Sequence, residues 1–304
     1  MSEPYPRDLV GYGEHPPHPR WPGDARVALS FVLNYEEGGE RSILHGDSAS
    51  EVYLHEVPGG TPLEGERSLS VESIYEYGAR AGFWRVRRLF AERQLTLTVY
   101  AVGMALERNP DAARAMVASG FEVASHGWRW IDYHDVPEAE EREHIKLAIA
   151  AIERATGARP VGWYTGRISP NTRRLVAEEG GFLYDSDSYA DDLPYWEVVA
   201  GAPQLIVPYT LDNNDMKYAV ANGFDNGAGF FQYLRDAFDV LYAEGADSPK
   251  MMSVGLHCRL VGRPGRAAAL ARFLDYVRGH ERVWITTRKA IAQHWRSQHP
   301  YRAG

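Results

Sequence analysis

Short apolar runs alternate with helical patterns over most of the chain. The first run, residues 27–33 (VALSFVL), ends in the acidic stretch Asn34-Tyr35-Glu36-Glu37-Gly38. Continuous apolar runs bounded by polar residues are typical of strands buried on both faces of a parallel sheet. Further strands are expected at residues 95–102, 121–125, 161–164, 182–185, 204–208, 251–257 and 283–286.

Helical patterns fill most of the intervals between these runs. Helices are expected at residues 73–93, from Pro110 to Gly120, from 135–137 to Gly157, and at 171–179, 229–243, 264–279 and 288–298. Proline in a first turn and glycine after a last turn mark the ends of two of them. Strands that alternate with helices indicate α/β architecture, and about eight strands suit a distorted parallel (β/α) barrel in a single domain.

Two segments fall outside this alternation. Residues 1–24 contain six prolines, which exclude regular helix and favour an extended arm ahead of a barrel domain at 25–304. Residues 39–72 are rich in glycine, serine and charged residues and follow the acidic pair directly. Loops of this length in compact domains are usually functional or lie at interfaces.

Polar residues follow the ends of several predicted strands. Because the C-terminal ends of parallel strands share one rim of a barrel, residues far apart in sequence are expected to meet there. The residues at these positions are Glu36, Glu37, His126, Arg167, Asp185 and His257.

This rim offers the groups that hydrolyse an amide. Such a reaction needs a base for water, an acid for the leaving nitrogen and a positive group for the oxyanion. Glu36 or Glu37 can serve as base and His257 as acid, while Arg167 and Arg259 can bind carbonyl oxygens. An acidic pair can equally cap a loop, and a histidine at a strand end is equally often a structural hydrogen-bonding residue.

Other candidates have similar alternatives. Asp185 and Asn214 lie in polar runs that suit ligand binding or turn formation, and Trp130 and Trp163 suit a pocket wall or the core. Glu37 and His126 could ligate a divalent metal, but a usable site normally has three protein ligands.

Composition and charge narrow the possible partners. Apolar residues make up 44% of the chain, and 33 basic against 41 acidic residues give a net charge of −8. This balance favours neither nucleic acid nor anionic membrane as a partner. The start of the chain lacks the features of a secretory signal, so a cytoplasmic location is expected. Cys258 is the only cysteine, which excludes an internal disulfide, and it is expected to be buried.

Several segments together resemble the polysaccharide deacetylase family. They are the acidic pair after the first strand, the His126 segment, residues 156–160 leading to Arg167, and the late His257. Within that family, residues 34–40, 162–167, 209–216 and 257–259 look like the cofactor-independent allantoinases of bacterial purine catabolism. The resemblance extends from the arm nearly to the C-terminus.

The resemblance implies a distorted (β/α) barrel, a homotetramer and hydrolysis of allantoin to allantoate without a metal. Metal-dependent deacetylases have two aspartates where Glu36 and Glu37 stand, the first a base and the second a ligand. They have two histidines where His126 and Trp130 stand, and a leucine where Gly255 stands. The implied base and acid are Glu36 and His257. The implied contacts to a ureide substrate are Glu37, His126, Trp130, Trp163, Arg167, Asp185, Asn214 and Arg259.

Two other functions fit the same pattern. The first is a metal-dependent N-deacetylase of a sugar or peptidoglycan, in which Glu37 and His126 would bind a metal such as zinc; Trp130 counts against it. The second is a non-catalytic barrel that binds a ureide or sugar. Retention of a base, an acid and an arginine at one rim counts against the second.

Overall fold

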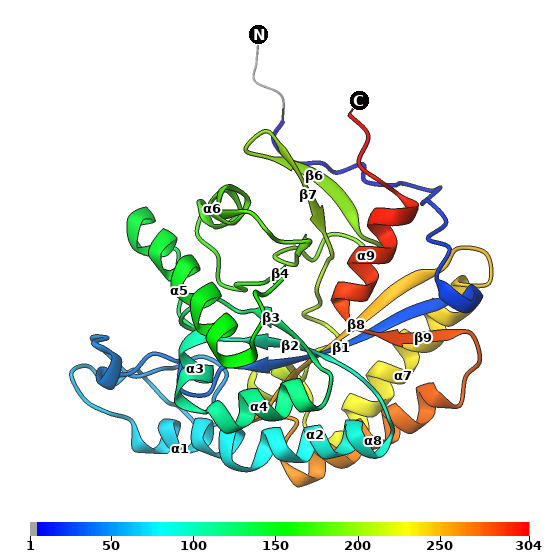
Figure 1. The fold of residues 1–304 in the computed structure, drawn as a ribbon. Coiled ribbons are helices and arrows are strands. Elements are labelled where there is room, and N and C mark those ends of the chain that lie inside the picture. The colour runs from blue at the N-terminus through cyan, green and yellow to red at the C-terminus, as the bar shows by residue number, and fades with distance from the viewer. Residues whose placement is uncertain (1–4, 304) are drawn as a thin grey trace.

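Strand β1 (Val27–Tyr35) pairs with three other strands of a nine-stranded sheet in the computed structural model, which describes residues 5–303. Strand β8 (Lys250–His257) pairs with β1 along one edge. The other edge is divided, because β9 (Val283–Thr286) pairs with residues 27–30 and β2 (Thr98–Ala101) pairs with residues 32–35. The two neighbours diverge from this edge, and the sheet curls as a distorted barrel (Figure 1).

The remaining strands continue the sheet beyond β2. Their order is β3 (Glu122–Ser125), β4 (Gly162–Trp163), β5 (Tyr184–Asp185), β7 (Ala202–Ile206) and β6 (Tyr195–Val199). All neighbouring pairs are parallel except β6 and β7. The predicted distorted parallel (β/α) barrel is therefore confirmed, with one additional antiparallel strand.

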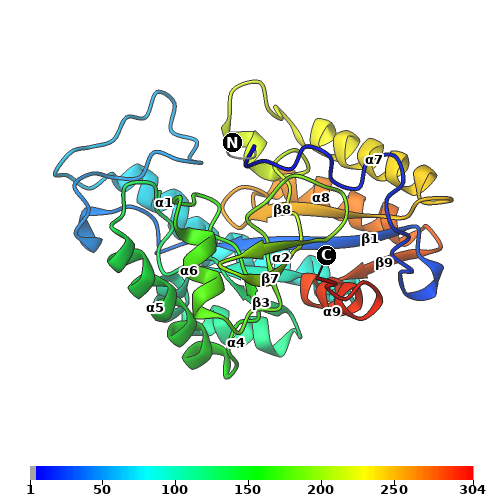
Figure 2. The same cartoon turned by 90° about the horizontal axis from the view of Figure 1, so that it is seen from above.

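Helices connect most of these strands and cover the outside of the sheet (Figures 1 and 2). They are α1 (Leu69–Tyr77), α2 (Phe83–Glu92), α3 (Gly103–Arg108), α4 (Pro110–Ala118), α5 (Glu138–Thr156), α6 (Thr172–Glu179), α7 (Gly227–Glu244), α8 (Pro264–Arg278) and α9 (Arg288–Gln298). A π-helical turn, η3 (Gly78–Gly82), joins α1 to α2. Three short 3-10 helices are η1 (Pro22–Asp24), η2 (Ile43–His45) and η4 (Asp215–Ala219).

Alternate residues of β1 belong to two different cores. Leu29, Phe31 and Leu33 pack in the cluster that includes the inner faces of α2, α7 and α8. Ala28 and Val32 pack in the cluster inside the barrel. Side chains alternate between faces along a strand, so Asn34 continues the inner set and Tyr35 the outer set. The same alternation places Met252, Val254 and Leu256 of β8 on the outer side.

The described part of the N-terminal arm, residues 5–24, packs on its own domain; Pro4 of the predicted arm lies outside the described residues. Trp21 is buried beside Trp284 and Trp295, and its indole N–H donates to the carbonyl of Lys250 at 3.0 Å. Tyr12 donates to the carbonyl of Pro194 at 2.7 Å.

Within residues 5–303, the helices are too short or too polar to cross a membrane.

Truncation of Phe31 should destabilise the whole domain. This side chain is fully buried and packs edge-on against Phe90 and Phe273. Phe31→Ala should lower the free energy of unfolding by about 3–5 kcal/mol, because it removes apolar contacts and leaves a cavity. Denaturant unfolding would measure this loss, with Val240→Ala as a control because Val240 is 57% exposed. Equal stability of the two variants would contradict the predicted core.

Candidate active site

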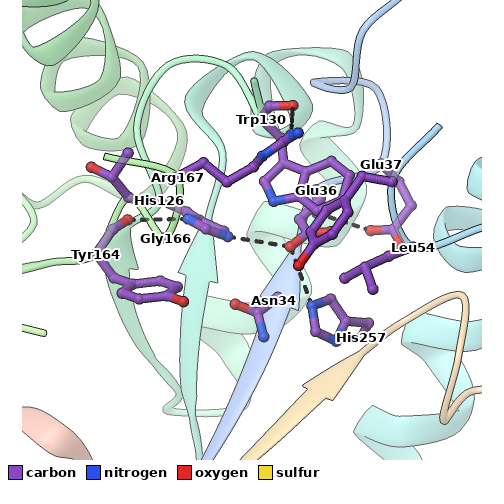
Figure 3. A network of polar contacts seen from close by, with 12 residues as sticks. Asn34, Glu36, Glu37, Leu54, His126, Trp130, Tyr164, Gly166, Arg167 and His257 are labelled. Carbon is purple, nitrogen blue, oxygen red and sulfur yellow. Dashed lines mark hydrogen bonds and ion pairs between the residues drawn. The ribbon is translucent and has the colours of Figure 1, made fainter. Parts of the chain in front are cut away.

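A fully buried carboxylate, Glu36, lies at the centre of the rim formed by the C-terminal ends of β1, β3 and β8. Its Oε1 lies 3.2 Å from Nε2 of His126 and 3.4 Å from Nε2 of His257. Its Oε2 accepts a hydrogen bond from Nη1 of Arg259 at 2.6 Å. Figure 3 shows Glu36, His126 and His257 turned toward one another. The structure thus brings Glu36 together with three other residues predicted from the sequence, which are His126, His257 and Arg259.

His257 is held from behind by Asp215, which opens η4. The Asp215 carboxylate accepts from Nδ1 of His257 at 2.6 Å and from its backbone N–H at 2.8 Å. A third bond, from the N–H of Val261, fixes the same carboxylate at 2.9 Å. His257 therefore lies between two carboxylates, with Nε2 directed at Glu36. His126 is fixed by the carbonyl of Tyr164, 3.1 Å from its Nδ1.

These contacts set opposite charges on Glu36 and His257. Burial opposes ionisation of Glu36, but the charges of Arg259 and His257 and the histidine hydrogen bonds outweigh it and hold the pKa of Glu36 well below its usual value. Burial likewise disfavours imidazolium, yet Glu36 and Asp215 raise the pKa of His257 to about 9. Near neutral pH the pair is therefore an ionised base beside a protonated acid.

Glu37 does not face the same side as Glu36. Its Oε2 accepts from the backbone N–H of Glu36 at 3.1 Å, and its carboxyl lies against Gly78 in the π-helical turn. Burial raises the pKa of Glu37 to about 7, with Arg259 opposing the rise and the charge of Glu36 adding to it. The alternation of β1 thus continues past the strand, with Glu36 inward and Glu37 toward the helices.

A cavity of about 190 Å³ opens in front of Glu36 and His257. A cavity of this size holds many waters and suits a small molecule. The cavity is lined by Asn34, Glu36, Tyr53, Leu54, His126, Trp130, Tyr164, Gly166, Arg167, Tyr189, Tyr209, Leu211, Asn214, Met216 and His257.

Arg167 supplies positive charge at this cavity. Its Nη2 donates to the carbonyl of Trp130 at 2.6 Å, and its guanidinium lies over the indole of Trp130 at 4.3 Å from the ring centroid. Its Nε is buried without a hydrogen-bond partner among the described residues. Figure 3 shows Arg167 and Trp130 beside His126 at the upper side of the cavity. Arg167 can therefore offer a donor to a carbonyl or carboxylate oxygen of a ligand.

The long loop predicted at residues 39–72 supplies one wall. Tyr53 and Leu54 line the cavity. The carbonyl of Tyr53 accepts from the hydroxyl of Tyr75 at 3.2 Å, and the carbonyl of Leu54 accepts from Nε of Arg259 at 3.1 Å. The loop is thus tied both to α1 and to the segment after β8. It ends earlier than predicted, because α1 begins at Leu69 rather than near residue 73.

Asn34 presents a fixed acceptor to the cavity. Its amide nitrogen donates to the hydroxyl of Tyr209 and to the carbonyl of Leu256, each at 3.0 Å. Both amide hydrogens are therefore used, and within residues 5–303 no donor is paired with Oδ1. Asn214 also lines the cavity, but its amide donates to the carbonyl of Thr210 and accepts from the N–H of Met216.

Glu37 and three other predicted substrate contacts do not line the cavity. Trp163 packs in the cluster with Ile145 and Leu175, and its indole donates to Thr165 at 2.9 Å. Asp185 is buried and accepts from the backbone N–H of Asp187 at 2.7 Å. Arg259 is fully buried and is bonded to Glu36 and Leu54. None of the three lines the cavity.

Glycines allow the site to be packed this closely. A Cβ at Gly82 of the π-helical turn would lie 1.9 Å from the carbonyl oxygen of Cys258, and one at Gly78 would lie 2.2 Å from Oε1 of Glu37. A Cβ at Gly255 would lie 2.2 Å from the amide nitrogen of Asn214. Gly255, the departure from the leucine of the deacetylases, thus makes room for the Asn214 segment. Cys258 faces the outer core and is buried, as predicted.

The residues present do not fit the metal site of the deacetylases. In residues 5–303, no group of three His, Cys, Asp or Glu side chains is arranged to hold a metal ion. The carboxyl of Glu37 lies at Gly78, and Trp130 offers no ligand atom. The guanidinium of Arg259, 2.6 Å from Glu36 and 3.8 Å from Glu37, already supplies positive charge there. No step is therefore derived through a metal.

Sequence reasoning missed two groups that complete the site. Asp215 is 42 positions from His257 in sequence, and only its place in the polar run 212–215 could have indicated it. Asn34 was part of the first motif, but its role follows from the inward alternation of β1. No pattern in the sequence indicated that Tyr53 and Leu54 reach the cavity.

Comparisons with known proteins show the family to which this fold is similar. The model of the polysaccharide deacetylase family matches residues 66–182. A polysaccharide deacetylase, described as probable, from Pseudomonas aeruginosa PAO1 is 62% identical, with a TM-score of 0.96 over 98% of this chain and all of that one. The crystal structure of Puue allantoinase is also 62% identical, with a TM-score of 0.97 and the same coverage. A Schizosaccharomyces pombe (strain 972) protein, whose name also refers to polysaccharide deacetylases, is 48% identical over 98% of this chain and 99% of its own length.

Substitution of Gly82 should disturb the site from outside the cavity. Gly82→Ala forces α2 and the Cys258 backbone apart and should lower the free energy of unfolding by about 1–3 kcal/mol. It should also shift the ring-proton NMR signals of the adjacent His257. Gly265→Ala is the matched control, because a Cβ there meets nothing within 4 Å. Unchanged stability and unchanged His257 signals in Gly82→Ala would contradict the close packing.

Proposed function

The chain belongs to the polysaccharide deacetylase family, and we propose that within it the protein is an allantoinase, which hydrolyses a ring amide of allantoin to give allantoate. The observation that carries this proposal is the contact between the Glu36 carboxylate and the His257 imidazole, which Asp215 orients, at one cavity. The likeness to Puue allantoinase over nearly the whole of both chains supports the choice of substrate.

In the proposed reaction, Glu36 activates a water molecule in the cavity. The carboxylate takes a proton as the water oxygen bonds to the carbonyl carbon of the ring amide. His257 then gives the proton on Nε2 to the ring nitrogen, and the C–N bond breaks. The product has a carboxyl group on the former carbonyl carbon and one more N–H bond on the former ring nitrogen, and this carboxyl group releases its remaining water-derived proton to solvent to become a carboxylate.

The direct contact between the two groups completes the proton cycle. After the reaction Glu36 carries a proton and His257 lacks one. The 3.4 Å contact between Oε1 of Glu36 and Nε2 of His257 allows that proton to return, which restores both starting states. Asp215 keeps the imidazole in the required orientation throughout. The difference between the pKa of Glu36 and that of His257 favours this return.

Recognition of a ureide follows from the polar groups around the cavity. A hydantoin ring with a ureido substituent carries several N–H donors and C=O acceptors. Asn34 offers Oδ1 to an N–H group, whereas Arg167 offers guanidinium donors to an oxygen. Tyr164, Tyr189 and Tyr209 bring hydroxyl groups to the same space. The volume of about 190 Å³ favours such a molecule over a polysaccharide chain.

The leaving group makes a metal-free reaction chemically reasonable. The hydantoin nitrogen is flanked by two carbonyl groups, so its developing negative charge is delocalised. The nitrogen of an acetylated amino sugar lacks this stabilisation, and Lewis-acid assistance lowers that barrier more. We therefore propose that Arg167 stabilises the oxyanion without a metal.

The purified protein should convert allantoin to allantoate, and the activity should survive exhaustive chelation. Glu36→Gln should lower kcat at least about 100-fold, because it removes the general base. Glu37→Gln, the same substitution one residue later, should keep most of the activity because that side chain faces away from the cavity. A coupled assay of allantoate formation measures all three proteins.

Two results would contradict the proposed function. One is absence of allantoin turnover together with metal-dependent release of acetate from an acetylated sugar, which would support the deacetylase alternative. The other is binding of allantoin with no turnover, which would support a non-catalytic barrel.

The fall of kcat/KM at high pH should be set by the deprotonation of His257. His257 must be protonated to act as acid, so kcat/KM should fall as the pH rises above about 9, the pKa of His257. Asp215→Asn removes a charge that favours imidazolium, so the pKa of His257 should fall. The basic limb should then move to lower pH by about one to three units.

Asp212→Asn is the matched control for this experiment. Asp212 belongs to the same polar run but is exposed, and its carboxylate bonds to Thr210 and Tyr233 rather than to His257. Its basic limb should coincide with that of the unmodified protein. A basic limb that stays in place in Asp215→Asn would contradict the role of His257.

A further inference from the structure

Arg259 is a fully buried cation that reaches Glu36 from behind the cavity. Its guanidinium lies against the ring of Tyr75 at 4.3 Å and against that of Trp130 at 4.8 Å, measured to the ring centroids. Nε donates to the carbonyl of Leu54 at 3.1 Å, and Nη1 donates to Glu36 at 2.6 Å. These contacts fix the side chain in one position.

The guanidinium is shared unequally by two neighbouring carboxyl groups. Nη1 lies 2.6 Å from Oε2 of Glu36 but 3.8 Å from Oε1 of Glu37. Both carboxyl groups are buried, and their mutual repulsion disfavours two negative charges in this space. One fixed cation that hydrogen-bonds only to Glu36 therefore favours the ionised form of Glu36 more than that of Glu37.

We propose that Arg259 is a positioning residue that selects Glu36, and not Glu37, as the ionised base and holds it toward the cavity. This inference rests on the proposed function, in which Glu36 activates water. It assigns to Arg259 a role behind the site rather than contact with substrate.

The other charged groups around the pair agree with this assignment. Glu36 is also faced by His126 from β3 and His257 from β8, so nitrogen atoms of three side chains converge on it. Glu37 is faced by Arg259 and by the charge of Glu36, and its Oε1 is buried without a hydrogen-bond partner among the described residues. An ionised oxygen in that position would be costly, whereas a protonated carboxyl loses less on burial. The two pKa directions, lowered at Glu36 and raised at Glu37, are consistent with this division.

Arginine is required here because lysine cannot reproduce the same contacts. The planar guanidinium donates from two separate nitrogens and stacks on aromatic rings with its face. A lysine ammonium is a single point charge on a narrow stem. It could reach Glu36 or Leu54 but would not occupy the space between Tyr75 and Trp130 in the same way.

The test compares Arg259→Gln and Arg259→Lys with the unmodified protein. Arg263→Gln is the matched control, because Arg263 follows on the same segment and also stacks on a tyrosine, Tyr77, at 3.6 Å without reaching Glu36. The acid limb of kcat/KM for allantoin should move to higher pH by about one to three units in Arg259→Gln, as expected for loss of a neighbouring opposite charge. Arg259→Lys should show a smaller shift in the same direction, and Arg263→Gln should show none.

Infrared difference spectroscopy gives a readout that needs no substrate. Glu36→Gln made in the unmodified protein should remove an ionised carboxylate band at pH 6. In the Arg259→Gln background, the pH at which this carboxylate band gives way to a protonated carboxyl band should be higher by about one to three units. A purely structural role for Arg259 would lower stability without moving this pH.

Coincident acid limbs in folded Arg259→Gln and the unmodified protein would overturn the proposal, as would conversion of the Glu36 carboxylate band to the carboxyl band at the same pH in both backgrounds. If Arg259→Gln does not fold, Arg259→Lys decides, and a coincident limb there overturns the proposal. If the unmodified protein does not hydrolyse allantoin, the proposed function fails separately, and the infrared result alone decides the role of Arg259.

Discussion

The ionised carboxylate of Glu36 is the constraint on which the rest of the site depends. A buried charge costs several kcal/mol unless it is paired and hydrogen-bonded. Here it is compensated by side chains from three places, His126 after β3, His257 at the end of β8, and Arg259 beyond it. Each of these is fixed in turn by Tyr164, Asp215 or Leu54. The charge on one residue therefore accounts for the precise placement of segments more than 200 positions apart in the sequence.

The main architecture could be predicted because strands that are buried on both faces appear in the sequence as continuous apolar runs. β1 and β8 are long, mostly apolar runs, and they pair from Val27 to Asn34 of β1. The parts that sequence reasoning missed leave weaker traces. β6 pairs with β7 across a turn at Ala200-Gly201, both with positive φ, and this pair lacks the Asn-Gly or Asp-Gly signal of such turns. The π-helical turn depends on contacts of Gly78 and Gly82 with distant residues, which no local pattern reports.

The sequence predicts those site residues that lie directly at the ends of strands. Glu36, His126 and His257 lie at strand ends and meet as expected. Trp163, a candidate for the pocket wall, and Asp185, a candidate for ligand binding, do not line the cavity. The difference between Glu36 and Glu37 follows from the two-residue alternation of β1 and not from their chemistry, which is identical. Asp215 and the Tyr53 wall depend on how loops return to the rim, and that is decided by tertiary contacts.

The attachment of the 39–72 loop affects how molecules enter the cavity. The backbone carbonyls of Tyr53 and Leu54 in this wall accept hydrogen bonds from Tyr75 and Arg259. Movement of the wall away from the cavity would therefore break the bond between Leu54 and Arg259, the residue that also contacts Glu36. The most exposed lining residues are Tyr53, Tyr189 and Leu211, at 39%, 46% and 42%, and they mark the entrance. A ligand that enters on this side therefore passes two tyrosine rings and a leucine side chain before it meets the buried Glu36 and His257.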